Sequence, residues 1–514
     1  MEKSALRMLE KFQKAKTNRV LFESLFEECY EYAMPMRQSF YYESPGQRRD
    51  DKIFDETAVV GVQEFASRLQ SGLVPNFARW ADLLAGSEVP EQNQDDINNS
   101  LDQVTDYVFE IIQNSNFGQE VHESFMDLAV GTGILLVEEG DAVNPIRFNA
   151  IPLPTVYLDT GPDDKIDHVY RQRSLKYEEI PIAYQNAELG EKTAKSVASN
   201  PDAKVDVVEI VCRNYSKPNQ DLFDFFVINI PDKELIFQDQ FSGTGSNPFV
   251  CFRWSKASGE IYGRGPLINA LSAIKTTNLT IELVLENAQM AISGIYQMDD
   301  DGVMNTDTIN LVPGTIIPKA MGSMGLQPIR AAGDFNVANL ILNDMRNNIK
   351  RALYNDMLGD PNKTPASATE VAERMADLSR RIGSAFGRLQ AEMVQPILQR
   401  VVYILKYQGR IELPVINGRE VKIRSVSPLA QAQANQDITS ISRYLQLVGG
   451  TFGPEILTLL VKPEDVAVHL AEKFGVPDTL IRDSVEREEL GRAAQRYQEA
   501  QSRGEMPDVQ SLRP

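Results

Sequence analysis

Three histidines, His122, His168 and His469, are the first residues to examine for metal chemistry. They are isolated, with no HxH or HxxxH spacing and no cysteine close enough in the sequence to act as a further ligand. Structural zinc sites use four ligands, commonly histidine and cysteine pairs a few residues apart. The sequence therefore predicts no zinc site, and the histidines are interpreted as surface or hydrogen-bonded side chains.

Nucleotide and acyl-transfer motifs are also missing. No GxxxxGK[ST] sequence occurs, which argues against a motor of the P-loop type, and no GxSxG elbow occurs. The sequence GTGILL, which begins at Gly131, lacks both a preceding strand and the third glycine of a phosphate-binding loop. We therefore expect Gly131 to mark the end of a helix that passes into a strand.

Carboxylates are plentiful, so an enzyme with an unrecognised pair of acidic residues stays open as an alternative. The runs Asp163–Asp164 and Asp299–Asp301 lie beside turn residues. They are interpreted as a turn and a solvated loop rather than as metal sites. No catalytic residue, metal site or cofactor is predicted.

The composition is that of a folded protein, with 42% hydrophobic and 24% charged residues among 514. A chain of this length is too long for one hydrophobic core, so about two to four substructures are expected. The longest apolar run, Leu128–Val137, is far shorter than a bilayer requires, and no signal peptide or membrane association is expected. Three scattered cysteines, Cys29, Cys212 and Cys251, predict no disulfide scaffold and a reducing, cytoplasm-like compartment. The net charge of −20 fits either simple solubility or a surface that repels DNA.

Apolar periodicity predicts helices at both ends of a β-rich middle region. The helices are expected over 1–34, 55–73, 95–114 and 120–130, and the β layer over 131–247. Gly263 and Gly265 are expected to loosen the start of a long helix, with Pro266 in its first turn. The apolar stripe of this helix comprises Leu267, Leu271, Ile274, Ile281, Leu285, Ala288 and Ile292.

Two further helices follow a small β-like module that contains the pieces GIYQM, INLVPGTIIP and LQPI. The first runs over about 336–357 and ends in the sequence LGDPNK. The second begins with a capping box, Ser367 to Glu370, covers about 40 residues and contains Pro396, which should kink it. A strand pair is expected within 410–426, followed by helices over 430–448, 463–475 and 484–503.

Three long amphipathic helices in one chain must each bury an apolar stripe. One chain offers few partners for them, whereas a ring of identical chains in head-to-tail contact supplies neighbours on both sides.

Several segments, in their order and spacing, resemble the head-to-tail connector, or portal, proteins of short-tailed double-stranded DNA bacteriophages. The resemblance covers most of the chain. It is carried by Ile261–Ile292, Thr364–Leu398, the SPLAQAQ sequence at Ser427–Gln433, the segment FGVPDTLIRDSVEREELGRAAQRYQEAQ, and the early segment ASRLQSGLVPNFARWADL. It implies an α+β fold, mostly α, with wing, stem, clip and crown, that assembles as a dodecameric ring.

The resemblance also implies a division of the chain. The N-terminal helices and the β layer (1–262) would form the wing. The stem would comprise helices 263–293 and 336–357, with the clip (294–335) between them and a tunnel loop (358–368) after them. Residues 369–426 would return to the wing, and 427–514 would form the crown and a C-terminal tail.

A portal would be a ring of twelve at one capsid vertex of the virion, assembled in the host cytoplasm, through which genomic DNA is packaged and ejected. Its partners would be the double-stranded DNA, the major capsid protein and scaffold, the large terminase motor and the tail adaptor protein. Lys363, with Asn362 and Thr364, would lie in the tunnel loop and touch phosphates. Glu282 and Glu286 would keep friction low on an acidic stem face. A different ring-forming head–tail adaptor is the alternative within the same class of protein.

Overall fold

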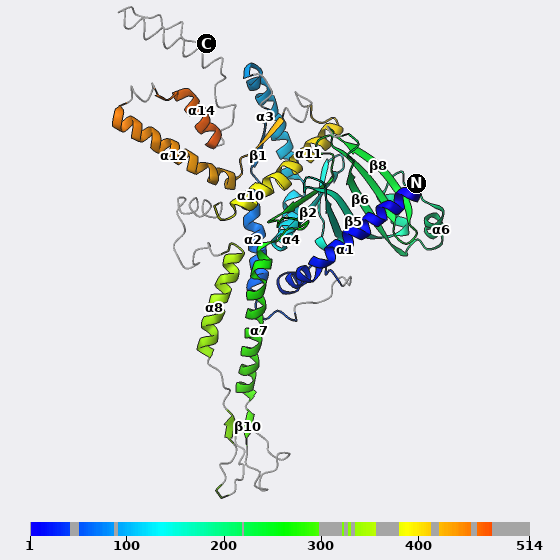
Figure 1. Ribbon diagram of the computed structural model, residues 1–514, viewed down its shortest axis with the longest axis vertical. Helices are drawn as coiled ribbons and strands as arrows, with labels where there is room; N and C mark the ends of the chain where they lie inside the picture. The colour runs from blue at the N-terminus through cyan, green and yellow to red at the C-terminus, as the bar shows by residue number, and fades with distance from the viewer. Residues whose placement is uncertain are drawn as a thin grey trace, which may run out of the picture. The chain divides into compact units, whose positions relative to one another are not determined.

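The computed structural model describes most of the chain, namely residues 2–41, 51–86, 91–217, 220–293, 295–297, 321–322, 327–329, 335–355, 380–412, 421–453 and 460–474 (Figure 1). The chain divides into two compact units. Unit 1 comprises Met1–Phe26, Gln63–Pro266 and Met357–Pro514, and unit 2 comprises Glu27–Val62 and Leu267–Asp356.

Unit 1 contains a five-stranded antiparallel sheet in the order β4-β5-β6-β7-β8, which confirms the predicted β layer. Its strands are β4 (Val156–Thr160), β5 (Ile166–Lys176), β6 (Lys204–Arg213), β7 (Leu222–Asn229) and β8 (Glu234–Ser242). The short helix η1 (Leu153–Thr155) precedes β4, and η2 (Tyr177–Glu179), α5 (Ile180–Ala183) and α6 (Glu191–Ser199) connect β5 to β6. Strands that follow one another along the chain are neighbours in the sheet.

The first part of helix α1 (Glu2–Ala33) packs on one face of this sheet. Ala5, Phe12 and Ala15 of the helix are buried in one cluster with Tyr157 and Tyr170 of the sheet. Arg19 is 2% exposed and donates to the carbonyl oxygens of Leu153, Pro154 and Val156 at 2.7–3.2 Å. These bonds occupy acceptors beside the edge strand β4, which is one way proteins protect an open sheet edge.

A second, three-stranded sheet in unit 1 has the order β3-β2-β9. Its strands are β2 (Thr132–Glu139), β3 (Ile146–Ala150) and β9 (Phe249–Arg253), and it packs with α4 (Phe117–Val130), which follows α3 (Glu91–Asn114). Gly131 is the C-cap of α4 and is followed directly by β2. The prediction that GTGILL is a helix end that passes into a strand is therefore confirmed.

Of the strand pair predicted within 410–426, the structure describes only the second strand. Strand β12 (Val421–Ser425) pairs antiparallel with β1 (Ala81–Ala85), a strand that the sequence analysis did not identify. Residues 411 and 412 lie outside any strand, and 413–420 lie outside the described residues. The local alternation of residues indicated a strand but not its partner, because strand pairing depends on contacts that are distant in sequence.

The described part of the kinked helix comprises α10 (Gly383–Leu389), a π-helical turn (Gln390–Val394) and α11 (Gln395–Tyr407). Proline has no N–H for an intrahelical hydrogen bond, and the wider turn comes directly before α11, whose second residue is Pro396. The prediction that Pro396 does not end the helix is confirmed, and a π turn precedes the proline. The predicted capping box at Ser367 and Glu370 lies outside the described residues.

Two helices of the C-terminal region are described, α12 (Pro428–Phe452) and α14 (Pro463–Phe474). The Ser427 hydroxyl caps α12 by accepting from the Ala430 N–H. The helix continues through Gly449 and Gly450 and ends at Gly453, which has φ 88°. The predicted end near residue 448 was therefore too early, and the predicted helix over 484–503 lies outside the described residues.

Unit 2 contains α7 (Pro266–Ser293), α8 (Phe335–Ala352), the last part of α1 and the first turns of α2 (Thr57–Leu73). A short strand pair, β10 (Ile295–Gln297) with β11 (Gln327–Ile329), matches two of the three predicted β pieces. Helix α8 ends five residues before the predicted Met357, because Tyr354 adopts a left-handed conformation with φ 59°. INLVPGTIIP and Asp299–Asp301 lie outside the described residues.

Candidate functional site: the long helices and their anchors

The start of α7 is fixed by two glycines that pack against the end of α4. Gly263 N donates to Thr132 Oγ1 at 2.9 Å, and Gly265 N donates to the Val130 carbonyl oxygen at 2.7 Å. A Cβ added to Gly265 would lie 2.0 Å from the Ala129 carbonyl oxygen, and one on Gly263 would lie 2.1 Å from the Gly131 carbonyl oxygen. The expectation that these glycines loosen the helix start is therefore wrong, since their missing side chains permit a close, hydrogen-bonded backbone contact.

Gly131 completes the same contact and needs glycine for two reasons. Its φ of 153° is a conformation that residues with side chains rarely adopt, and an added Cβ would lie 2.1 Å from the Gly263 carbonyl oxygen. Its own carbonyl oxygen accepts from Trp254 N at 2.9 Å. The GTG and YGRG sequences thus form one packing motif in unit 1.

In unit 2, the segment before α2 ties α7 to α8. The Asn278 Oδ1 atom of α7 accepts hydrogen bonds from the backbone N–H groups of Phe54 (2.8 Å) and Asp55 (3.1 Å). The Asp55 carboxylate accepts from the Thr57 N–H at 2.9 Å, at the start of α2, and from Arg346 Nε of α8 at 2.7 Å. One aspartate therefore caps α2 and holds α8, while its own backbone is held by α7.

The electrostatic state of Asp55 follows from these contacts. Its side chain is 4% exposed and that of Arg346 is 40% exposed. Burial by itself would raise the pKa of Asp55, but the hydrogen bonds from Thr57 and Arg346 outweigh burial and hold the pKa below its usual range. The carboxylate is thus charged at neutral pH.

The C-terminal end of α8 also packs against the first turns of α2. Asn355 Nδ2 donates to the Gly61 carbonyl oxygen at 2.7 Å, and Leu353, which is fully buried, lies over Gly61. A Cβ on Gly61 would lie 2.7 Å from Leu353 Cδ1. Residues 27–62 therefore form one compact unit with α7 and α8.

Helix α7 buries only the first half of its apolar stripe. Leu267, Leu271 and Ile274 are at most 6% exposed, whereas Leu285 of the same stripe is 53% exposed. Glu282 is half-buried and Glu286 is exposed, and neither joins an ion pair within the described part of the chain. The second half of α7 therefore offers both apolar and acidic side chains for contacts that one chain does not make.

The π-helical turn carries a buried ion pair in unit 1. The Glu392 carboxylate accepts from the backbone N–H (3.0 Å), Nε (3.1 Å) and Nη2 (2.7 Å) of Arg253, whose side chain is 4% exposed. Arg253 is the last residue of β9, so this contact covers the open edge of the three-stranded sheet. The pair fixes the π turn against the sheet. Apart from Pro396, nothing in the sequence indicated this contact.

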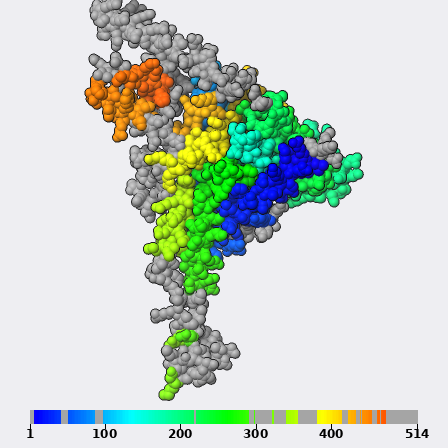
Figure 2. Space-filling view, viewed as in Figure 1, coloured from blue at the N-terminus to red at the C-terminus, as the bar shows by residue number. Residues whose placement is uncertain are grey.

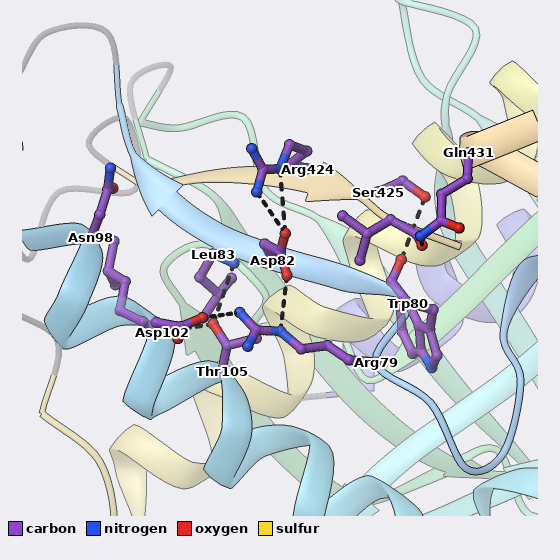
Figure 3. A network of polar contacts seen from close by, with 12 residues as sticks. Arg79, Trp80, Asp82, Leu83, Asn98, Asp102, Thr105, Arg424, Ser425 and Gln431 are labelled. Atoms are coloured by element: carbon purple, nitrogen blue, oxygen red, sulfur yellow. Dashed lines mark hydrogen bonds and ion pairs between the residues drawn. The ribbon is translucent and has the colours of Figure 1, made fainter. Parts of the chain in front are cut away.

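The β1–β12 pair is surrounded by a charged network that Figure 3 shows. Arg79 contacts Asp82 (2.8 Å), Asp106 (2.9 Å) and Asp102, and Asp82 also pairs with Arg424 of β12 at 2.9 Å. Burial would lower the pKa of Arg79, but the three carboxylates outweigh it and raise the pKa. An isolated two-stranded sheet is marginal in water, so this network and the packing on α3 stabilise the strand that leads into α12.

The predicted DNA-facing residues are only partly described. Glu282 and Glu286 lie on α7, whereas Asn362, Lys363 and Thr364 lie outside the described residues.

Asp163 and Asp164 form a turn in which Gly161 N donates to the Lys165 carbonyl oxygen, as predicted. No group of three His, Cys, Asp or Glu residues in the described ranges could hold a metal ion, and the three cysteines are free. None of the described helices is long and apolar enough to cross a membrane.

The comparison with protein families places this fold in a known class. The family model described as "Bacteriophage head to tail connecting protein" matches residues 5–481. The chain therefore belongs to the bacteriophage head-to-tail connecting proteins, and its function is that of a phage portal protein, a structural part of the head-to-tail connection.

Individual relatives agree with this class. The portal protein of Salmonella phage epsilon15 is 24% identical over 521 residues, which cover 96% of this chain and 92% of that protein. The probable portal protein of Bordetella phage BPP-1 is 24% identical over 489 residues, which cover 88% and 84%. Among solved structures, chains of gene transfer agent particles are similar at 12% identity. A chain from the neck of an empty particle has a TM-score of 0.36 (82% of this chain, 90% of that one), and one from a native virion has 0.35 (77% and 86%).

Proposed function

We propose that twelve copies of this chain form a closed ring at one capsid vertex, around a channel through which double-stranded DNA is packaged and later ejected. In this proposal α7 and α8 are the stem, 294–335 the clip and 358–368 the tunnel loop. The wing comprises 1–262 and 369–426, and the crown and tail comprise 427–514. The ring assembles in the host cytoplasm without enzymatic activity of its own. It meets the major capsid protein and scaffold, then the large terminase motor, and finally a tail adaptor protein.

The observation that carries the ring is the position of exposed leucines on α7. Leu279 (56% exposed) and Leu283 (50% exposed) lie on one face, and Leu285 (53% exposed) lies about 200° from Leu283 around the helix. Exposed leucines stabilise an assembly by roughly 1.5–3 kcal/mol each when a neighbour buries them fully. Two opposite apolar faces at the same height need two neighbours, and repeated head-to-tail contacts that close give a ring.

The positions of the leucines around α7 also suggest which side of the helix faces the channel. Glu282 and Glu286 lie on the arc of α7 between the two leucine faces, and Thr280 and Val284 lie on the opposite arc. In a ring one of these arcs faces the channel. We assign the acidic arc to the channel, because a duplex carries one negative charge per ~1.7 Å and a basic wall would bind it tightly.

The ring is tested by placing a charge on each apolar face in turn. Leu283→Asp and Leu285→Asp should each give particles smaller than the wild-type ring, measured by sizing and by electron micrographs of the purified protein. Thr280→Asp is the matched control, because it adds the same charge to the same helix between the two faces. A wild-type monomer or dimer, or intact rings in both leucine variants, would contradict the proposal.

The tunnel loop is tested separately through Lys363. Its ammonium group is proposed to contact DNA phosphates together with Asn362 and Thr364. Lys363→Ala and Lys363→Glu should reduce DNA packaging or retention in assembled heads while leaving the ring intact. Unchanged packaging and retention in both variants would remove Lys363 from the proposed DNA contacts.

A further inference from the structure

The N-terminal helix carries a concentration of positive charge in an otherwise acidic chain. Residues 2–19 contain six lysines and arginines and two glutamates, a formal charge of +4, within a chain of −20. Arg7, Lys11 and Lys14 are spaced by four and three residues, so they lie within about 60° of one another on one face of α1. We call these three residues the basic stripe.

The fold presents the basic stripe on a fixed support. Ala5, Phe12 and Ala15 are buried against the five-stranded sheet, and the Phe12 ring meets the Tyr157 ring edge-on at 5.2 Å. Arg7 and Lys14 are exposed and Lys11 is half-buried. Figure 2 shows α1 lying uncovered along the face turned to the viewer.

The basic stripe is not neutralised by the chain itself. Within the described part of the structure, Arg7, Lys11 and Lys14 form no ion pair with a carboxylate, although Glu10 borders the stripe. Salt bridges elsewhere in unit 1 engage many of its arginines, as at Arg79 and Arg253. The basic stripe is therefore a local reversal of charge on a protein with a net charge of −20.

We propose that the basic stripe of α1 binds the phosphate backbone of duplex DNA on the outer surface of the protein, without sequence preference. Arg7 and Lys14 are about 10 Å apart along the helix axis, a length over which one DNA strand spans about three phosphate intervals of 3.4 Å along the duplex axis. The three side chains can therefore contact neighbouring phosphates of one strand. Binding of DNA by the basic stripe does not require the proposed ring.

A nucleic acid fits this surface better than an acidic protein does. Lysine is depleted in protein–protein interfaces, which are organised around buried aromatic and apolar anchors. Leu6, at 41% exposure, is an exposed apolar side chain on these turns, but it lies about 100° from Arg7 around the helix. Long basic side chains without an apolar anchor are typical of backbone contacts to DNA.

The experiment measures binding of the full-length protein to a fluorescent 20-base-pair duplex as a function of salt. The variant Arg7→Glu, Lys11→Glu, Lys14→Glu reverses the stripe. The matched control Lys192→Glu, Lys195→Glu, Lys204→Glu makes the same charge change at exposed lysines of unit 1. Because each neutralised phosphate contributes a slope of about −0.9, three contacts should weaken wild-type binding about 40-fold between 50 and 200 mM salt.

The proposal expects the stripe variant to bind at least about tenfold more weakly at 50 mM salt, with a slope reduced by about 2.7, and the control to bind like the wild type. The neutral variant Arg7→Gln, Lys11→Gln, Lys14→Gln should give an intermediate loss, which guards against a folding defect in the reversed one. Equal losses in stripe and control variants, or no loss in either, would overturn the proposal. Competition by polyglutamate as effective as by unlabelled duplex would assign the stripe to an acidic protein instead. Ring formation, read from micrographs of the same samples, reports on the proposed function independently.

Discussion

Removal of the Asp55 carboxylate should loosen the start of α2 and helix α8, because this one group caps α2 and holds Arg346 of α8. Loss of a helix cap costs about 1 kcal/mol. The ion pair with Arg346 adds at most about 1 kcal/mol, since the arginine side chain is 40% exposed and solvent weakens the attraction. Asp55→Ala should therefore destabilise the local structure by about 2 kcal/mol. Asp55→Asn, which keeps an oxygen for the Thr57 N–H, should cost about half as much.

Hydrogen exchange followed by mass spectrometry measures this effect at the right place. A loss of about 2 kcal/mol corresponds to a roughly 30-fold faster exchange of amides protected by local opening. The faster exchange should appear in peptides from 51–62 and 335–355, while peptides from the sheets of unit 1 keep their wild-type rates. Asp51→Ala, an exposed aspartate of the same segment, is the control and should change nothing.

The pH dependence of the Asp55 variants gives a second, independent reading. The pKa of Asp55 is lowered in the folded protein, so its contribution is complete above the unfolded value of about 3.9 and is lost as the pH falls through the folded pKa. The difference between wild type and Asp55→Asn should thus be constant near pH 7 and shrink below about pH 4. Unchanged exchange in Asp55→Ala, or a difference that persists undiminished in acid, would refute the assigned role.

Three further outcomes are expected. Gly265→Ala should prevent folding or lower the free energy of unfolding by several kcal/mol, on the order of the most damaging single substitutions, because the added Cβ would lie 2.0 Å from a backbone carbonyl oxygen. Gly383→Ala is the control, since it has open space around it and should be neutral or slightly stabilising. Thermal melts measure both effects. Burial, followed by the nearby charge of Lys11, lowers the pKa of His168, so stability should decline as the pH falls below about 6.5, and His168→Gln should flatten this decline in melts between pH 5 and 7. Arg79→Ala leaves the three carboxylates of Asp82, Asp102 and Asp106 without their shared cation and should loosen the β1–β12 strand pair. Limited proteolysis should then cleave faster near β12, with unchanged cleavage in the five-stranded sheet. Equally fast cleavage in both regions would contradict this role of Arg79.

Much of the fold could be predicted from local patterns. The helices α1, α2, α3, α4 and α7 begin and end within a few residues of the predicted ranges, because apolar spacing and helix-ending residues act over one or two turns. The β layer was predicted from strand-rich sequence, and the irregular helix from Pro396. Portal function was also predicted, although from the resemblance of ordered segments rather than from any single chemical motif.

Other features depend on residues that are distant in sequence. Strand β1 was missed because ADLLA is too short to show alternation, and its partner carries Arg424, which lies 342 residues from Asp82. Nothing local indicates that Asp55 would join Asn278 and Arg346, or that the glycines of YGRGP would need the GTG turn as their packing surface.

The sequence alone therefore determined where the long helices form, that their stripes require neighbours, and that no known catalytic motif interrupts them. Tertiary structure decided which half of the α7 stripe is buried within the chain and which half is left exposed. It also decided that the glycines before α7 make a close backbone contact with the end of α4. Apolar periodicity shows only which side of a helix is apolar. Burial depends on which other segment, however distant in sequence, lies against that side.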